Sequence, residues 1–192
     1  MNREDWLKTA EQSMKSWIVA EGYAYPAQTR ISCGFPKASR GRNHSIGQCW
    51  TSKASSDDTA EIFISPTQAN PARVCDILLH EMVHATVGVD CGHKKPFIKL
   101  ARALGLEGKI TATVAGEALT QRISTMLDTL PAYPHAELHP LDGLKGPKKQ
   151  TTALLKVECG SCGYIARVTA KWIDSVGAPI CPCNGEAMSC QP

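Results

Sequence analysis

The feature that most constrains this chain is the pentapeptide His80-Glu81-Met82-Val83-His84, an H-E-x-x-H motif within an apolar stretch. On an α-helix, residues four positions apart lie on one face, one turn from each other, so His80 and His84 can bind the same Zn²⁺. Glu81 follows the first histidine, where its carboxylate can take a proton from a water molecule instead of binding the metal. The motif therefore predicts a helix that carries a metal site and a general base.

The residues around the motif favour a metal site over a chance pair of histidines in a buried helix. Asn70-Pro71 predicts the N-cap and first turn of this helix, and Gly88 predicts its end. Ionisable groups are rarely left in a buried helix without a partner or a metal. The flanking positions are apolar nearly all round: Val74, Ile77, Leu78, Leu79, Met82, Val83 and Ala85.

Candidates for a third ligand follow the expected helix end at once. A five-residue turn after Gly88 could fold His93 back onto the metal. Asp90 and Cys91 lie in the same turn and are rival third ligands, although a lone cysteine at such a place is more often a small buried hydrophobe. We expect His93 to be the ligand, with the other two residues as alternatives.

Length and composition set the class of protein. The 192 residues are enough for one medium domain and a small module, and the net charge of +3 is too mild to imply nucleic acid by itself. The N-terminus has no apolar signal-peptide core, and no run approaches the ~18 apolar residues of a membrane span. We therefore expect a cytoplasmic protein, nucleoid-associated in a bacterium, with no membrane partner.

A helix and a small sheet are expected before the motif. Residues 30–35, 46–50 and 60–65 are predicted strands of an antiparallel sheet, and residues 62–65 are expected to edge the substrate cleft, where a substrate could add a strand. The basic stretch 37–44 is interpreted as a solvated loop, with phosphate binding as the alternative. The first helix is predicted from apolar residues at helical spacing, namely Trp6, Leu7, Ala10, Met14, Trp17 and Ile18.

Two helices and an extended segment are predicted after the motif. The first helix opens near Pro96, residues 110–114 form a strand or an extended segment, and the second helix carries Leu119, Ile123 and Leu130. Prolines and glycines then mark residues 131–150 as a linker, in which His135 and His139 are interpreted as linker residues and not as ligands.

Two cysteine pairs mark a C-terminal module, residues 151–192. Cys159 and Cys162 precede a predicted strand at 164–168, and Cys181 and Cys183 follow it. Two cysteine knuckles on a hairpin describe a zinc ribbon, because so short a module cannot build a sufficient core without a metal. Cys190 is an alternative ligand, since the second pair is C-x-C instead of C-x-x-C.

The module and its approach are basic, with a net charge of +5 over residues 145–171. Basic and aromatic residues on a ribbon suit single-stranded nucleic acid, through phosphate contacts and base stacking. The alternative is a solvated hairpin with Trp172 packed beneath it, and composition does not decide between the two. The candidate nucleic-acid contacts are Lys148, Lys149, Lys156, Tyr164, Arg167, Lys171 and Trp172.

These parts in this order resemble the SprT-like metalloprotease family, the group that includes Spartan. The resemblance rests on the strand at residues 62–65, the motif stretch 78–85, Gly92-His93 before Pro96-Phe97, and the cysteine ribbon. It implies that His80, His84 and His93 bind a catalytic zinc and that Glu81 is the catalytic base. Relatives of the Spartan type degrade proteins crosslinked to DNA and are activated by DNA, single-stranded DNA especially.

We therefore expect an α+β chain: a zincin-like metalloprotease domain at residues 1–130, a linker at 131–150, and a small β zinc ribbon at 151–192. The expected cofactors are one catalytic Zn²⁺ and one structural Zn²⁺, the latter on Cys159, Cys162, Cys181 and Cys183. The expected partners are a protein substrate and DNA. Two alternatives stay open: a non-enzymatic nucleic-acid-binding adaptor, and a metallopeptidase with no DNA role.

Overall fold

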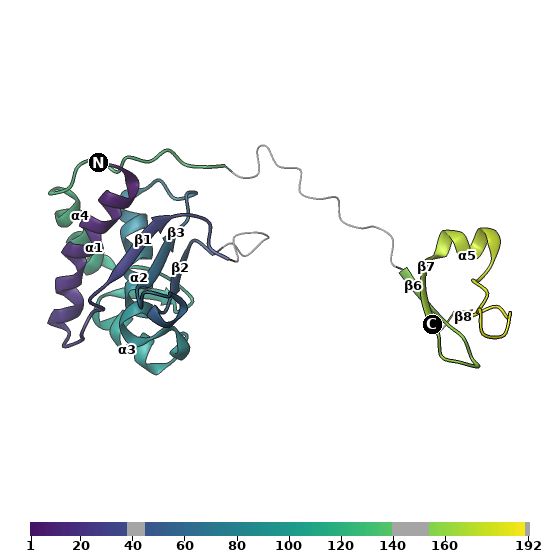
Figure 1. Cartoon of the computed structure of the whole chain (residues 1–192). Coiled ribbons are helices and arrows are strands. Elements are labelled where there is room, and N and C mark those ends of the chain that lie inside the picture. The colour runs from purple at the N-terminus through teal and green to yellow at the C-terminus, as the bar shows by residue number, and fades with distance from the viewer. Residues whose placement is uncertain (38–44, 140–153, 191–192) are drawn as a thin grey trace. The chain divides into compact units, whose positions relative to one another are not determined.

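The computed structural model of the chain describes residues 1–37, 45–139 and 154–190, which belong to two units, 1–142 and 143–192 (Figure 1). The described residues form helices and small sheets, which confirms the α+β class. Most of the basic stretch, residues 38–44, lies outside the described residues, and so do Lys148 and Lys149.

Helix α1 (Arg3–Ala20) begins with a capping box, in which the Asn2 side chain accepts the Asp5 N–H and Asp5 accepts the Asn2 N–H. Its apolar stripe is buried as the spacing predicts, and the tryptophans Trp6 and Trp17 belong to the core. The stripe packs on strand β1 and helix α2. Burial of this stripe therefore fixes α1 against the element that carries the H-E-x-x-H motif.

The first sheet is mixed, so the prediction of an antiparallel sheet is wrong for one of its two strand pairs. Strand β2 (Gly47–Trp50) pairs antiparallel with β3 (Ala60–Ile64), but β1 (Thr29–Cys33) pairs parallel with the other edge of β3. The order is β1-β3-β2, so β3 is central. Alternation of apolar residues identifies a strand but does not state which neighbour it pairs with, or in which direction.

Helix α2 (Pro71–Val87) is the central element of the first unit. It packs against α1, the first sheet, α3 (Lys95–Ala103), α4 (Glu117–Leu127) and β5 (Ala112–Ala115). Leu78, Leu79 and Met82 on this helix are fully buried, together with Ile62 and Ile64 on the facing sheet. The apolar surroundings of the motif are therefore the core of the unit, as the sequence predicts.

A hairpin of β4 (Leu106–Lys109) and β5 follows α3, and only its second strand was anticipated from the sequence. Further along, residues 131–139 lie against the first unit. Trp6 Nε1 donates to the carbonyl of Pro131 at 2.8 Å, and Leu138 N donates to the carbonyl of Pro66 at 2.9 Å. His135 contacts the same Pro66 carbonyl through Nε2 at 2.8 Å, so this part of the expected linker is attached to the first unit.

The second unit contains a three-stranded sheet in the order β7-β6-β8, together with one short helix, α5 (Ala170–Val176), that the sequence analysis did not predict. Its strands are β6 (Leu154–Glu158), β7 (Ile165–Thr169) and β8 (Ser189–Cys190). The buried core is small: Val157, Cys159, Cys181 and Met188. In neither unit do the described residues include a helix with the length and apolarity that crossing a membrane requires.

Candidate metal centre

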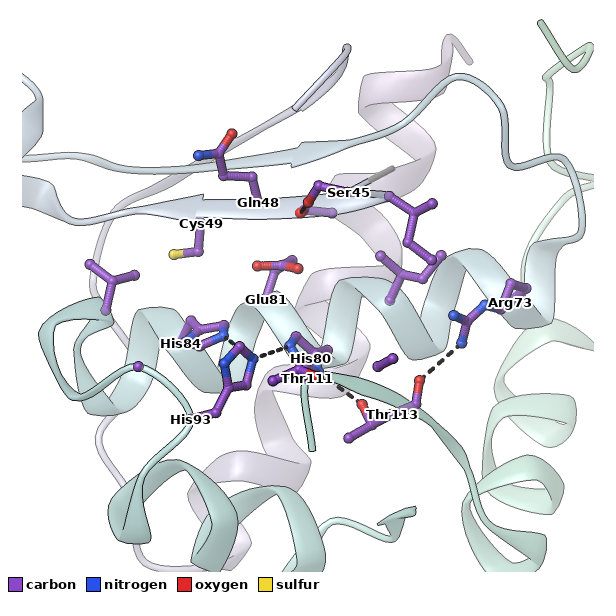
Figure 2. Close-up of a pocket in the computed structure, with 16 residues that line it drawn as sticks. Ser45, Gln48, Cys49, Arg73, His80, Glu81, His84, His93, Thr111 and Thr113 are labelled. Atoms are coloured by element: carbon purple, nitrogen blue, oxygen red, sulfur yellow. Dashed lines mark hydrogen bonds between the residues drawn. The ribbon is translucent and has the colours of Figure 1, made fainter. Parts of the chain in front are cut away.

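Three histidine rings converge at the middle of α2 (Figure 2). Asn70 caps the helix through Arg73 N, and the helix ends at Gly88, whose φ of 89° only glycine adopts readily. The chain then turns through η2 (Val89–Cys91) and Gly92, with φ of 52°, which returns His93 to the helix. This turn is the predicted route by which a third histidine reaches the pair on the helix.

The geometry of the histidine cluster fits a metal ion. Nε2 of His93 lies 3.2 Å from Nε2 of His80 and 3.2 Å from Nε2 of His84. A tetrahedral metal with nitrogen ligands at about 2.0–2.1 Å separates those nitrogens by about 3.3 Å. Within the described part of the chain, Asp90 and Cys91 do not belong to this group of possible ligands. The group can hold a metal ion, and three ligands leave a coordination position open.

Phe97 packs against all three histidine rings. Its ring centroid lies 4.8 Å from that of His80, 4.3 Å from that of His84 and 4.8 Å from that of His93. Phe97 is fully buried on α3. One aromatic side chain therefore orients rings that come from two separate segments, a role that the sequence analysis did not assign to it.

Burial keeps the histidines neutral. Desolvation, together with repulsion from the neighbouring imidazoles, lowers the pKa of His80 to about 3, and desolvation followed by His93 lowers the pKa of His84 to about 4. Desolvation also lowers the pKa of His93. Neutral imidazole is the form that binds metal, so no proton has to be displaced from these rings near neutral pH.

Glu81 faces β2 and is held in a narrow space. A Cβ atom built on Gly47 would lie 2.5 Å from Glu81 Oε1 and 2.7 Å from Ile77 Cγ2, so any larger residue at 47 would displace the carboxylate or the helix. Burial raises the pKa of Glu81 to about 8, opposed by a hydrogen bond from the backbone of Cys49. Gly47 is thus a site residue that the sequence analysis missed, although a glycine inside a strand signals a close approach of this kind.

The cluster opens into a pocket of about 450 Å³ that Glu81 and the three histidines line together with Gly47 and Cys49 of β2. The edge of this pocket is β2, so the expectation that residues 62–65 would form the edge is wrong. The physical reason is that β3 is paired on both sides and has no free edge. A second hollow of about 710 Å³ is also lined by His84, together with the end of α2 and the chain that follows β2.

The four predicted ribbon cysteines also converge. Sγ of Cys183 lies 3.7 Å from that of Cys159 and 3.4 Å from that of Cys181, and Sγ of Cys162 lies 3.6 Å from that of Cys181. A tetrahedral metal with sulfur ligands at about 2.3 Å separates them by about 3.8 Å. Backbone N–H groups of Cys162 and Ser161 lower the pKa of Cys159 to about 6, whereas hydrogen bonds with the Cys162 and Cys181 thiols raise the pKa of Cys183, so the thiols of this cluster titrate as one group. Cys190 is not part of the group.

The described candidate nucleic-acid residues lie at the surface of the second unit. Tyr164 is 54% exposed and Trp172 is 56% exposed, so Trp172 is not packed beneath the hairpin. Lys171 lies over the Trp172 ring, with Nζ 5.2 Å from its centroid. Arg167 stands opposite Lys156 in the β6–β7 register, and Lys156 also pairs with Glu158 at 2.6 Å. Among the described residues, Tyr164, Trp172, Arg167 and Lys171 are therefore exposed to a ligand, with Lys171 over one face of the Trp172 ring.

Comparison with family models, with curated proteins and with solved structures found no match to this chain. The two clusters are therefore interpreted from their own geometry.

The purified protein should carry two metal ions per chain, because the histidine and cysteine clusters are separate and each has the spacing of a ligand set. His80→Ala should lose one ion and Cys159→Ser should lose the other. The measurement is elemental analysis of protein purified without a chelator. A wild-type chain with a single ion would remove one of the two sites.

The metal-free wild type and Glu81→Gln should diverge in stability as pH rises. Because burial raises the pKa of Glu81 to about 8, the folded state binds more protons than the unfolded state, whose Glu pKa is about 4.3. The free energy of unfolding contributed by this group therefore falls between about pH 5 and pH 8. Glutamine does not titrate, so the free energy of unfolding of the variant, measured in urea, should rise relative to that of the wild type across this pH window. A difference that stays constant with pH would contradict the raised pKa.

Proposed function

We propose that this chain is a zinc-dependent endopeptidase of the SprT-like type, with a zincin-like first unit, and that it acts on proteins bound or crosslinked to DNA. The observation that carries the peptidase proposal is the meeting, in one pocket, of three convergent imidazole nitrogens and the Glu81 carboxylate. Three neutral nitrogen ligands with an open position are typical of catalytic zinc sites, whereas structural sites are closed by four protein ligands.

The proposed reaction divides the work between the histidines and Glu81. His80, His84 and His93 would hold a divalent ion, which when bound would supply Lewis acidity to the scissile carbonyl and to a water molecule. Glu81 accepts a proton from the attacking water while the water oxygen bonds to the carbonyl carbon. Glu81 then returns a proton to the leaving amine as the C–N bond breaks. Burial makes the Glu81 carboxylate a stronger base than a solvated one, which suits this role.

The free edge of β2 suits an extended peptide substrate. Because β2 pairs only with β3 in the described sheet, its other edge has backbone groups available for a further strand. A peptide added there would pass between β2 and the histidine cluster, with its backbone close to Glu81. Both hollows are lined by His84, which offers room for peptide beyond the metal centre and supports an endopeptidase.

The second unit supports the DNA half of the proposal. Tyr164 and Trp172 are exposed aromatic residues on which bases can stack, Lys171 lies beside Trp172, and Arg167 is a further exposed cation of the same unit. Stacking and phosphate contacts together favour single strands over duplex, in which the base faces are covered. The arrangement suits a module that brings the peptidase to DNA.

The adaptor alternative requires a closed, structural metal site on α2. The cysteine nearest to that role in the sequence, Cys91, is outside the histidine group, and so is the pocket residue Cys49. These observations favour the open site of a peptidase.

Glu81→Gln should keep the fold and both metal ions but lose peptide hydrolysis by at least ~100-fold, because an amide of nearly the same shape cannot accept the water's proton. The measurement is cleavage of an unfolded protein, with and without single-stranded DNA, alongside metal content. Glu107→Gln, which changes the same atoms on the exposed side of β4, is the matched control. Near-wild-type cleavage by the Glu81 variant would remove Glu81 as the base.

Trp172→Ala should weaken single-strand binding by about 1–3 kcal/mol with little change in its salt dependence, since one stacked base is lost. Arg167→Gln should instead lower the slope of log affinity against log salt by about 1, as expected for one phosphate contact. Val176→Ala, a change at an exposed apolar residue of the same helix as Trp172, is the control. Equal binding by all three variants would leave the peptidase proposal intact and remove the ribbon from DNA recognition.

A further inference from the structure

The two histidines of α2 differ in what their second ring nitrogen contacts. Nδ1 of His80 lies 2.8 Å from Oγ1 of Thr113 on β5. Nδ1 of His84 is buried, and no described residue offers it a hydrogen bond. His84 is thus oriented by packing, whereas His80 also has a specific polar partner from a distant segment.

Thr113 is itself held in place by α2. Arg73 Nη1 donates to the carbonyl of Thr113 at 3.1 Å and to Oδ1 of Asp76 at 2.6 Å, and Ala115 N donates to Oδ2 of Asp76 at 3.4 Å. Arg73, Asp76 and His80 follow one another at helical spacing along the face of α2 that β5 contacts. Figure 2 shows the bonds of Arg73 and His80 to this strand. The strand is therefore attached to the helix at three successive points.

These bonds are partly buried. Thr113 is 5% exposed and Asp76 is 6% exposed, whereas Arg73 and His80 are half-buried. A buried hydrogen bond is not readily exchanged for one to water, so losing the hydroxyl would leave Nδ1 of His80 without a partner.

A neutral imidazole carries its single proton on one ring nitrogen, and only the other nitrogen has a lone pair for a metal. We propose that Thr113 is a positioning residue of the metal centre: its hydroxyl oxygen accepts the Nδ1–H of His80, so that the unprotonated Nε2 faces His93. The partner of the second nitrogen fixes the tautomer and the orientation of a histidine ligand. The β4–β5 hairpin thereby acts on a ligand that it does not itself supply.

The test uses the full chain and two substitutions that separate hydroxyl from volume. Thr113→Val removes the hydroxyl and keeps the shape, whereas Thr113→Ser keeps the hydroxyl and removes a methyl group. The measured quantity is the affinity of the histidine cluster for Zn²⁺, determined by chelator competition. The His80→Ala variant, which should lack this site, identifies which of the two bound ions belongs to it. We expect Thr113→Val to lose about 10- to 100-fold in affinity and Thr113→Ser to remain close to the wild type. Thr125→Val, the same change at an exposed position of α4 that does not line the pocket, should leave the affinity unchanged.

A role in packing alone would reverse the order, because valine fills the buried space better than serine does. Unfolding of the metal-free variants is therefore measured in parallel. Zn²⁺ affinity of Thr113→Val equal to the wild type, or affinity of Thr113→Ser as low as that of Thr113→Val, would overturn the proposal. The inference depends on the proposed metal site but not on peptidase activity. Intact Zn²⁺ binding without hydrolysis would therefore overturn the proposed function alone, and a wild type that binds no Zn²⁺ at the histidines would overturn both.

Discussion

Helix α2 carries His80, Glu81 and His84 into the interior of the first unit, and removing such groups from water costs free energy that the surroundings must offset. The histidines stay neutral and pack on Phe97. Glu81 receives a backbone hydrogen bond from β2. Strand β2, helix α3 and strand β5 thus do more than cover an apolar helix, because each also contacts an ionisable side chain of α2.

The same constraint explains why the neighbours of α2 have the residues they do. A strand can lie close enough to bond the Glu81 carboxylate only where Gly47 leaves out a side chain. The turn to His93 needs two glycines with positive φ, and the hairpin that reaches His80 is attached through Asp76 and Arg73. Sheet edge, turn and hairpin are separate in sequence, and each brings a residue to the ionisable side chains of α2.

The sequence predicted what depends on local pattern. The bounds of α2 follow from Asn70-Pro71 and Gly88, the burial of α1 follows from its apolar spacing, and the two metal clusters follow from the spacing of histidines and cysteines. It did not predict what depends on pairing between distant segments. Tertiary packing sets the parallel β1–β3 pairing and the free edge of β2. The local sequence around Thr113 and Phe97 likewise does not indicate that their side chains contact His80.

The histidine cluster and the cysteine cluster differ in the size of the hydrophobic core that supports them. The histidine rings rest on a core that extends through α1, the sheet and three further helices, so that core does not rely on an ion. The buried residues of the second unit are Val157, Cys159, Cys181 and Met188, and two of the four are the proposed ligands themselves. We therefore expect the first unit to keep its fold when its histidine cluster is empty, whereas the second unit should lose its tertiary structure when its cysteine cluster is empty.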